Sequence, residues 1–369
     1  MKFTCLQENL LKGIQIAKQS GTKHTTLPVL QNFLIQELQG TLTITSTNLE
    51  LGIRAHVRGK EEGEGAITIP QDKLLAYVKN LPQDKVQLTV EEQTLHLVSG
   101  ADFSADFHGI TADEFPALPI IQSEHVITLA TSDFRNALKL SSVSLPKNDY
   151  RPEIAGVYVS KKGQTLIFTG TDGFRLSEKR FQIPALDDQE FAYIIPAKTV
   201  AEITRILDLT DDEEVSLAFG ENQVSITATQ VEIISKLVEG NFPQYEGLIP
   251  QQFARSLSVD KNDLVQAIRL SAVFASDTVN DVKFSFLDDK TLSIKSSNTE
   301  IGENVTNVPI SLSGEAGFEI TFNYTYLLDG INSCLGDVIT LHVNDSDSPA
   351  IMKGENPDEF FYLVMPIRE

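Results

Sequence analysis

"TLIFTGTDGFRLS", residues 165–177, decides the fold because it occurs three times in altered form. "TLTITSTNLELGI" stands earlier in the chain and "TLSIKSSNTEIGE" later. Each copy opens with Thr-Leu and an alternating run typical of a β-strand, followed by Asn or Asp and a second such run. Asn48, Asp172 and Asn298 are the equivalent polar positions, about a third of the chain apart. The repeat predicts three similar domains.

Helical segments repeat with nearly the same period. Apolar residues recur three or four positions apart in six segments, as amphipathic helices require. These segments are 7–19, 71–81, 132–143, 197–208, 261–272 and 323–333. Polar pairs such as Glu8-Asn9 and Asn262-Asp263 near their starts are reasonable N-cap residues. We expect an α+β fold of three tandem domains, each built from two β-α-β-β-β units, with boundaries at 1–122, 123–250 and 251–369.

The composition excludes several classes of protein. Two cysteines, Cys5 and Cys334, lie far apart without a CxxC partner, which argues against a disulfide scaffold or zinc site and favours a reducing cytoplasm. No apolar run is long enough for a signal peptide or a membrane span. The net charge of −21 argues against a polyanionic partner. Basic residues nevertheless outnumber acidic ones in the six helical segments, so a helical face that meets a polyanion stays open.

No catalytic motif or cofactor-binding pattern is present. The six histidines are scattered without ligand spacing, and the sequence lacks a Walker loop, HExxH and G-x-S-x-G. Three acidic pairs, Asp187-Asp188, Asp211-Asp212 and Asp288-Asp289, stand in turn-like contexts typical of solvated loops. A magnesium-dependent nuclease that uses such pairs is one alternative function, and a scaffold that binds proteins but not DNA is another. We expect no metal and no cofactor.

Several stretches together resemble the bacterial sliding clamp, the β subunit of the replicative DNA polymerase holoenzyme. They are "MKFT" at the start, "LPVLQNFLI" (27–35), "TDGFRL" (171–176), "SKLVEGNFPQY" (235–245), "FNYTYLLD" (322–329) and "YLVMPIR" (362–368). The resemblance covers the whole chain. It implies a head-to-tail homodimeric ring whose helices line the inner face around duplex DNA. It also implies a non-enzymatic processivity factor that tethers the replicative polymerase, the clamp loader, repair polymerases and other motif-bearing clients.

The resemblance also implies site residues. The candidate DNA contacts are basic residues of the helical segments together with loop residues that match DNA-facing loops of the family: His24, Lys73, Lys79, Lys147, Asn148, Arg151, Lys198 and Arg205. Residues that match a pocket for short client peptides are Ile154, Thr171, Gly173, Phe174, Arg175, Leu176, Pro243, Leu248, Tyr326, Leu363, Met365, Pro366 and Arg368. Phe107, Val273 and Phe274 match apolar dimer-interface positions, and an ordinary core role for these three is equally open.

Overall fold

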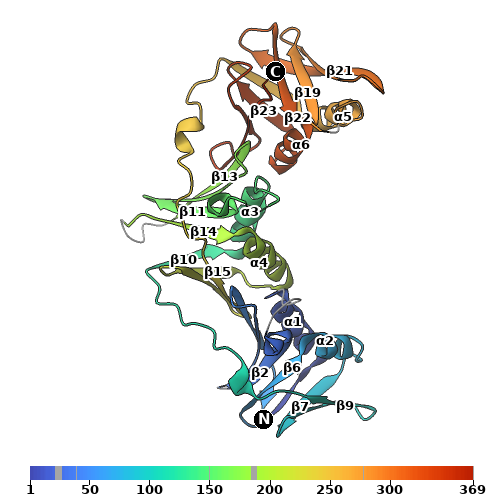
Figure 1. Ribbon diagram of the computed structural model, residues 1–369, viewed down its shortest axis with the longest axis vertical. Coiled ribbons are helices and arrows are strands. Elements are labelled where there is room, and N and C mark those ends of the chain that lie inside the picture. Colours follow the sequence, from blue (N-terminus) through green and yellow to red (C-terminus); the bar gives the residue numbers. More distant parts are fainter. Residues whose placement is uncertain (21–26, 39, 149, 184–188, 277, 369) are drawn as a thin grey trace. The chain divides into compact units, whose positions relative to one another are not determined.

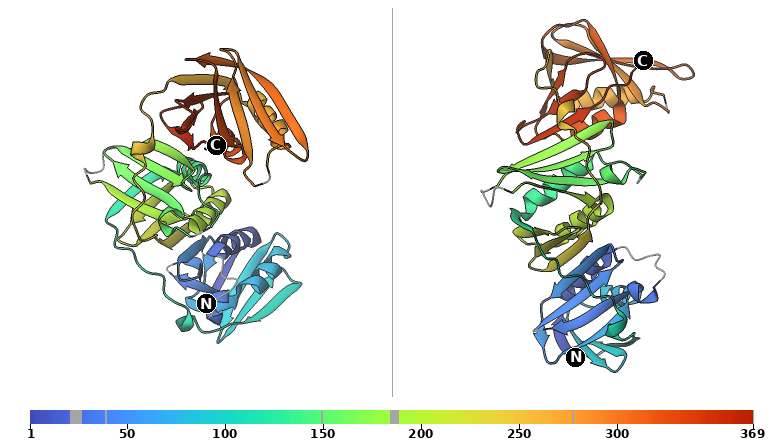
Figure 2. Two further views of the ribbon diagram at one scale, coloured as in Figure 1. Left: turned by 45° about the horizontal axis from the view of Figure 1, so that its top comes forward. Right: turned by 60° about the vertical axis from the view of Figure 1, so that its left-hand side comes forward.

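The computed structural model describes the chain except residues 21–26, 39, 149, 184–188, 277 and 369. The chain packs into two compact units, here called unit 1 (1–135 with 198–237) and unit 2 (136–197 with 238–369). Figure 1 labels the main elements and Figure 2 gives two further views. The described residues form six α-helices: α1 (Gln7–Ala17), α2 (Gln71–Lys79), α3 (Thr131–Ser142), α4 (Ala197–Leu209), α5 (Lys261–Ala272) and α6 (Tyr324–Ser333).

Unit 1 contains two antiparallel sheets. The five-stranded sheet has the order β5 (Lys60–Glu61), β1 (Lys2–Leu6), β7 (Lys85–Glu91), β8 (Thr94–Ser99) and β9 (Phe103–His108). The eight-stranded sheet has the order β10 (His125–Ala130), β15 (Glu214–Phe219), β16 (Gln223–Ala228), β17 (Val231–Lys236), β4 (Leu51–Val57), β3 (Thr41–Thr47), β2 (Asn32–Leu38) and β6 (Gly65–Pro70).

Unit 2 contains one antiparallel sheet of twelve strands. Its order is β14 (Phe191–Pro196), β11 (Gly156–Lys162), β12 (Thr165–Thr171), β13 (Arg175–Gln182), β25 (Phe360–Val364), β24 (Ala350–Lys353), β23 (Val338–Val343), β18 (Arg255–Asp260), β21 (Gly302–Ser313), β20 (Thr291–Asn298), β19 (Asp281–Phe286) and β22 (Phe318–Asn323). Helices α5 and α6 cover the part of this sheet that includes β19 and β22 (Figure 1).

The order of elements confirms the predicted α+β repeat. In each third of the chain a strand leads into a helix, three or more strands follow, and a second helix and three strands complete the pattern. All six expected helices form, with ends within two residues of the predicted ends. The spacing of apolar residues was sufficient because each helix buries one stripe on a sheet.

The three equivalent turns share one hydrogen bond from the backbone to a polar side chain. Asn48, Asp172 and Asn298 each accept a hydrogen bond through Oδ1 from the backbone N–H two residues further along, at 2.9 Å in all three copies. Such a side chain stabilises the turn by replacing a backbone acceptor. In the middle copy Gly173 has φ +91°, a conformation that favours glycine. The turn of the β12–β13 hairpin therefore lies at Asp172-Gly173.

The N-caps differ from the sequence interpretation. Helices α1 and α5 begin at Gln7 and Lys261, so the pairs Glu8-Asn9 and Asn262-Asp263 lie inside the first turn. Asp260, the last residue of β18, caps α5 by accepting from Asn262 N–H at 2.9 Å and Asp263 N–H at 3.0 Å. Leu6 precedes α1 and has no side-chain cap. Strand β18 ends directly before α5, so the last residue of the strand caps the helix. The sequence pattern did not reveal that the strand supplies the cap.

The core of unit 2 lies between its helices and the sheet. Phe284, Phe322, Ile331 and Tyr362 are among its fully buried side chains. Cys5 and Cys334, one in each unit, are free thiols, and burial raises the pKa of both to about 12. Among the described residues, no helix combines the length and apolar character needed to cross a membrane.

Candidate peptide-binding site and nucleic-acid interface

Side chains on β13 alternate between two faces of the unit 2 sheet. Leu176 pairs with Leu363 of β25, and Glu178 pairs with Thr169 of β12 and Phe361 of β25. We call the side that carries these residues the cluster face. The opposite side, the helix face, is the one on which Ser177 donates to the Ser141 carbonyl of α3 at 3.0 Å.

An apolar cluster covers the cluster face. Its buried members are Leu176, Tyr245, Ile351, Phe361 and Leu363, and the partly buried residues packed on it are Tyr158, Phe242, Ile249, Phe253 and Met365. Four of these ten lie in the connecting segment 237–254 between β17 and β18, which includes the short turn η5 (Glu246–Leu248). Figure 2 shows this gold segment passing beside the green strands of unit 2.

Aromatic contacts fix the connecting segment to the sheet. The Phe242 ring stacks on Tyr158 of β11 with a centroid distance of 4.5 Å, and it meets the Tyr245 ring edge-on at 6.0 Å. Glu246 forms an ion pair of 2.5 Å with Lys162 at the end of β11, which lowers the pKa of the Glu246 carboxyl. The cluster therefore combines buried and partly buried apolar side chains with a few polar groups at its edge.

Arg175 lies on the helix face although it is next to Leu176 in sequence. Its side chain is 5% exposed and forms ion pairs with Asp172 at 2.9 Å and with Asp329 of α6 at 2.5 Å. The guanidinium also lies 4.4 Å from the ring centroid of Tyr326 and donates to the Tyr362 hydroxyl at 3.4 Å. The N–H donors of the Arg175 guanidinium therefore bind partners within the chain itself. Arg175 and Tyr326 thus form a structural contact between the turn and α6.

The turn itself is held against the C-terminal segment. Met365 N–H donates to the Phe174 carbonyl at 2.8 Å, and Thr171 Oγ1 donates to the Arg175 carbonyl at 2.7 Å. The Phe174 side chain is 63% exposed. Two residues beyond Met365, Ile367 N–H donates to the Thr321 carbonyl of β22 at 2.8 Å. The predicted residues of the turn and of the C-terminal stretch are therefore neighbours.

The remaining predicted peptide residues lie in three places. Ile154 is buried in the short turn η4 (Pro152–Ile154), and Pro243 and Leu248 belong to the connecting segment, where Leu248 is 63% exposed. Pro366 is buried and Arg368 exposed in the last residues. The sequence prediction missed Tyr158, Thr169, Glu178, Phe242 and Tyr245. Alternation along β11, β12 and β13 from Leu176 would have identified Tyr158, Thr169 and Glu178, whereas the position of the connecting segment needed the structure.

The described DNA-contact candidates are all exposed. Lys73 and Lys79 lie on α2, Lys198 and Arg205 on α4, and Lys147, Asn148 and Arg151 on the loop after α3. Arg205 is paired with Glu202 at 2.7 Å and Arg151 with Glu153 at 3.0 Å. His24 falls outside the described residues. Two further bases are also paired: Lys18, just after α1, contacts Asp72 at 2.5 Å, and Arg135 of α3 contacts Asp208 at 2.9 Å. Several bases on or near the helices are therefore paired with carboxylates.

The three candidate interface residues differ in burial. Val273, just after α5, is 64% exposed, and Phe274 is half-buried beside it. Phe107 on β9 is half-buried and packs edge-on against Tyr77 of α2, with ring centroids 5.6 Å apart. Strand β9 is the last strand of its sheet. Val273 is therefore surface in the single chain, whereas the two Phe rings have partial packing within it.

The acidic pairs do not converge in the described structure. Asp211 pairs with Lys12 at 2.8 Å, which lowers the pKa of its carboxyl, and Asp288 caps a turn by accepting from Lys290 N–H at 2.8 Å. Asp187 and Asp188 lie outside the described residues. Within the described ranges no three His, Cys, Asp or Glu side chains are grouped to hold a metal ion.

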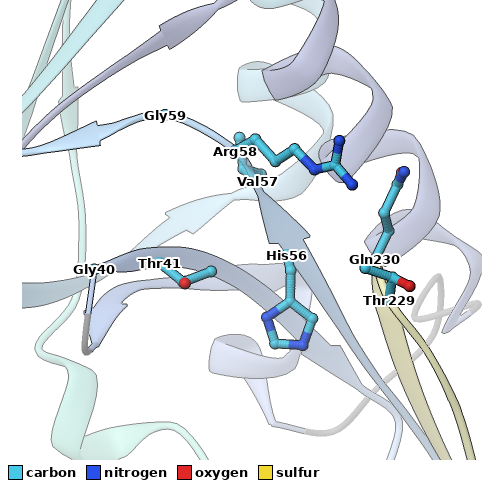
Figure 3. A pocket seen from close by; sticks show the side chains of 8 residues that line it. All are labelled: Gly40, Thr41, His56, Val57, Arg58, Gly59, Thr229 and Gln230. Atoms are coloured by element: carbon cyan, nitrogen blue, oxygen red, sulfur yellow. The ribbon is translucent and has the colours of Figure 1, made fainter.

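A polar cavity of about 380 Å³ lies in unit 1, apart from the predicted residues. Its lining comes from the ends of β3 and β4 and from the turn before β17: Gly40, Thr41, His56, Val57, Arg58, Gly59, Thr229 and Gln230 (Figure 3). Burial and the neighbouring Arg54 lower the pKa of His56, although Glu232 opposes them. Arg54 is itself paired with Glu232. No predicted site residue lines this cavity.

Family models match the chain in three consecutive parts. The N-terminal domain of the DNA polymerase III β subunit matches residues 1–119, the central domain residues 128–244, and the C-terminal domain residues 246–368. Together these matches span nearly the whole chain.

Relatives agree with this assignment. The chain is 30% identical to the β sliding clamp of Pseudomonas aeruginosa, with full coverage of both, and 26% identical to that of Bacillus subtilis, again with full coverage of both. A crystal structure of a Pseudomonas aeruginosa sliding clamp bound to griselimycin matches with a TM-score of 0.95 and 28% identity over all of both chains. A DNA polymerase III β subunit from Thermotoga maritima matches with a TM-score of 0.91 and 27% identity, covering 100% of this chain and 99% of that one. The chain belongs to the bacterial β sliding clamps, the non-catalytic processivity subunits of DNA polymerase III.

Proposed function

We propose that two copies of this chain close into a ring that encircles duplex DNA and tethers clients through the cluster face. Three domains with boundaries at 122/123 and 250/251 would then give six domains and twelve helices per ring. Twelve helices about 10 Å apart have a circumference of about 120 Å and leave an opening of roughly 28 Å, enough for a duplex and a water layer. We place this activity in the cytoplasm.

DNA retention in this proposal is topological. The exposed helix bases attract phosphates weakly and without base readout, because tight phosphate contacts would slow sliding. The pairing of Arg205, Arg151, Lys18 and Arg135 with carboxylates supports a weak surface. The acid-rich remainder of the chain, which gives the net charge of −21, discourages DNA from binding elsewhere.

Ring closure requires two surfaces that the single chain leaves open. Strand β9 carries Phe107 and has only β8 as a neighbour, so one edge of it lacks a described strand partner. Strand β21 pairs with β18 only from Ile310 onward, so the same edge of Gly302–Pro309 is also unpaired within the described chain. The Phe274 ring lies beside Gly302 at the start of β21, where an added Cβ would be 3.9 Å from it. Val273, the preceding residue, is exposed. Open edges bind other strands readily, which supports closure of β9 on β21 of a second copy.

Client binding is the part of the proposal that the site geometry supports best. The single observation that carries it is the apolar cluster of Leu176, Leu363 and Met365 with the aromatic residues of the connecting segment. Short peptides with Leu and Phe anchors suit such a surface, and an adaptable Met suits several clients. Replicative polymerase, clamp loader and repair polymerases are the expected clients.

Deletion of residues 365–369 tests the client site. We expect calorimetry to show loss of binding of polymerase and loader peptides, while the truncated chain stays a folded dimer by circular dichroism and sizing. Unchanged peptide affinity would refute the assignment.

A plasmid-retention assay tests the ring. We expect the protein to stay on nicked circular plasmid and to be lost after linearisation. Equal retention on both DNA forms would favour a non-topological DNA binder, and retention on neither would favour a protein scaffold.

A further inference from the structure

A buried carboxylate lies directly beneath the apolar cluster. Glu178 is 1% exposed, yet its side chain is on the cluster face between Leu176 and Arg180. A buried charge is tolerated only when hydrogen-bond donors and a counter-charge surround it. Glu178 therefore needs polar partners, which the aliphatic members of the cluster cannot supply.

Three side chains supply these partners. Arg180 Nε donates to Glu178 Oε1 at 2.5 Å, and the Tyr245 hydroxyl donates to Oε2. Thr169 Oγ1 lies 3.5 Å from the same Oε2 and 3.0 Å from the Tyr245 oxygen. Burial and the Glu178 carboxylate both raise the pKa of Tyr245, so its hydroxyl stays protonated and donates at all physiological pH values.

Tyr245 connects this network to the client surface. It is 4% exposed, its ring holds Phe242 edge-on, and its carbonyl accepts from Leu248 N–H at 2.9 Å. The two predicted peptide residues of the connecting segment, Pro243 and Leu248, lie on either side of it. Within the described residues, an ion pair between Lys162 and Glu246 also joins the segment to the sheet, and both of its side chains are about half exposed. Exposed pairs of this kind contribute little, so the buried network is the stronger anchor.

We propose that Glu178 is a positioning residue for client binding, which acts through Tyr245 to hold the connecting segment in the shape that receives the peptide. The inference rests on the proposed client site. Pre-organisation of this kind raises affinity because the segment does not lose conformational freedom when the peptide binds. The acidic side chain would thus serve an apolar ligand that it does not touch.

A double-mutant cycle in the full-length protein tests the coupling. The variants are Glu178→Gln, which keeps the shape but removes the charge, Tyr245→Phe, which removes one hydroxyl, and the double variant. The probe is a short synthetic peptide with Leu and Phe anchors, titrated by fluorescence anisotropy. We expect each single variant to weaken the peptide about tenfold, as loss of a charged hydrogen bond would. We expect the double variant to be no weaker than either single one.

Hydrogen exchange separates positioning from general loss of stability. The amides of Leu248 and Ile249, which donate to Tyr245 and Glu246 carbonyls, should exchange faster in Glu178→Gln, while core amides of β19 and β20 remain unchanged. Glu359→Gln is the matched control. Glu359 pairs with Lys179 at 2.6 Å on the helix face, so this variant should leave peptide affinity unchanged.

The outcomes distinguish failure of the positioning role of Glu178 from failure of the proposed client site. Wild-type affinity in both single variants, or losses that add in the double variant, would overturn the positioning role. Failure of the wild-type chain to bind any anchor peptide would instead overturn the client site itself. If Glu178→Gln does not fold, Tyr245→Phe alone decides, because it removes only the hydroxyl that links Glu178 to the segment.

Discussion

Arg175 of the β12–β13 hairpin and Asp329 of α6 are joined by an ion pair of 2.5 Å, with the guanidinium almost fully buried. The same guanidinium binds Asp172, so one cation links both carboxylates and lies over the Tyr326 ring. Its motif position indicates a ligand-binding residue, whereas its contacts hold a turn onto a helix.

Substitution Arg175→Met should therefore act on stability. Removal of the cation leaves the mostly buried Asp172 without a counter-charge, and we expect a loss of about 3 kcal/mol in the free energy of unfolding. Urea denaturation followed by circular dichroism measures it. The control is Arg205→Met, since Arg205 is exposed and its ion-pair partner among the described residues is Glu202 of its own helix. The loss in this variant should stay below about 0.5 kcal/mol. Equal losses in the two variants would contradict this account.

The cap of α5 gives a second prediction. Asp260→Ala removes the acceptor of two N–H groups in the first turn and should destabilise the chain by about 1 kcal/mol. Asn262→Ala, at the position that the sequence favours as a cap residue, should change the free energy of unfolding by less than about 0.5 kcal/mol. A larger effect at Asn262 than at Asp260, in thermal or urea unfolding, would show that the cap is misplaced.

Close packing at one glycine gives a third prediction. A Cβ on Gly170 would collide with the Ser141 carbonyl oxygen, which also accepts from Ser177. Gly170→Ala should therefore force β12 away from α3 and cost about 2 kcal/mol or more. At Gly247, in the connecting segment, an added Cβ meets no atom within 4 Å, so Gly247→Ala should fold normally. Differential scanning calorimetry of both variants checks the contrast.

The fourth prediction concerns pH. His342 of β23 stacks on Phe253 with centroids 4.6 Å apart, and burial together with Lys353 lowers its pKa from 6.5. The unfolded chain then takes up the proton more readily than the folded chain. This contribution to stability is complete above pH 6.5 and falls as the pH drops below that value. His342→Asn should flatten the pH dependence of stability below pH 6.5, and an unaltered slope in urea titrations would count against it.

Much of the fold could be predicted because the repeat constrains it three times over. Helix positions followed from apolar spacing, and the equivalent turns followed from Asn48, Asp172 and Asn298. The cap at Asp260 was missed because a strand residue supplies it.

The candidate site was predicted only in part. Motif residues located the two strands that carry Leu176 and Leu363, but the contribution of Tyr245 and Glu178 depends on how a segment without regular structure lies across the sheet.

Alternation along β13 has a consequence for the effects of mutations. Positions 176, 178 and 180 face the cluster, whereas positions 175, 177 and 179 face the helices and the core. A compound that occupies the cluster face lies on the side of the first set, beneath which Glu178 is buried. Resistance substitutions that spare the packing against the helices are therefore expected at positions 176 and 180, whereas a change at Glu178 would also loosen the connecting segment that it anchors through Tyr245.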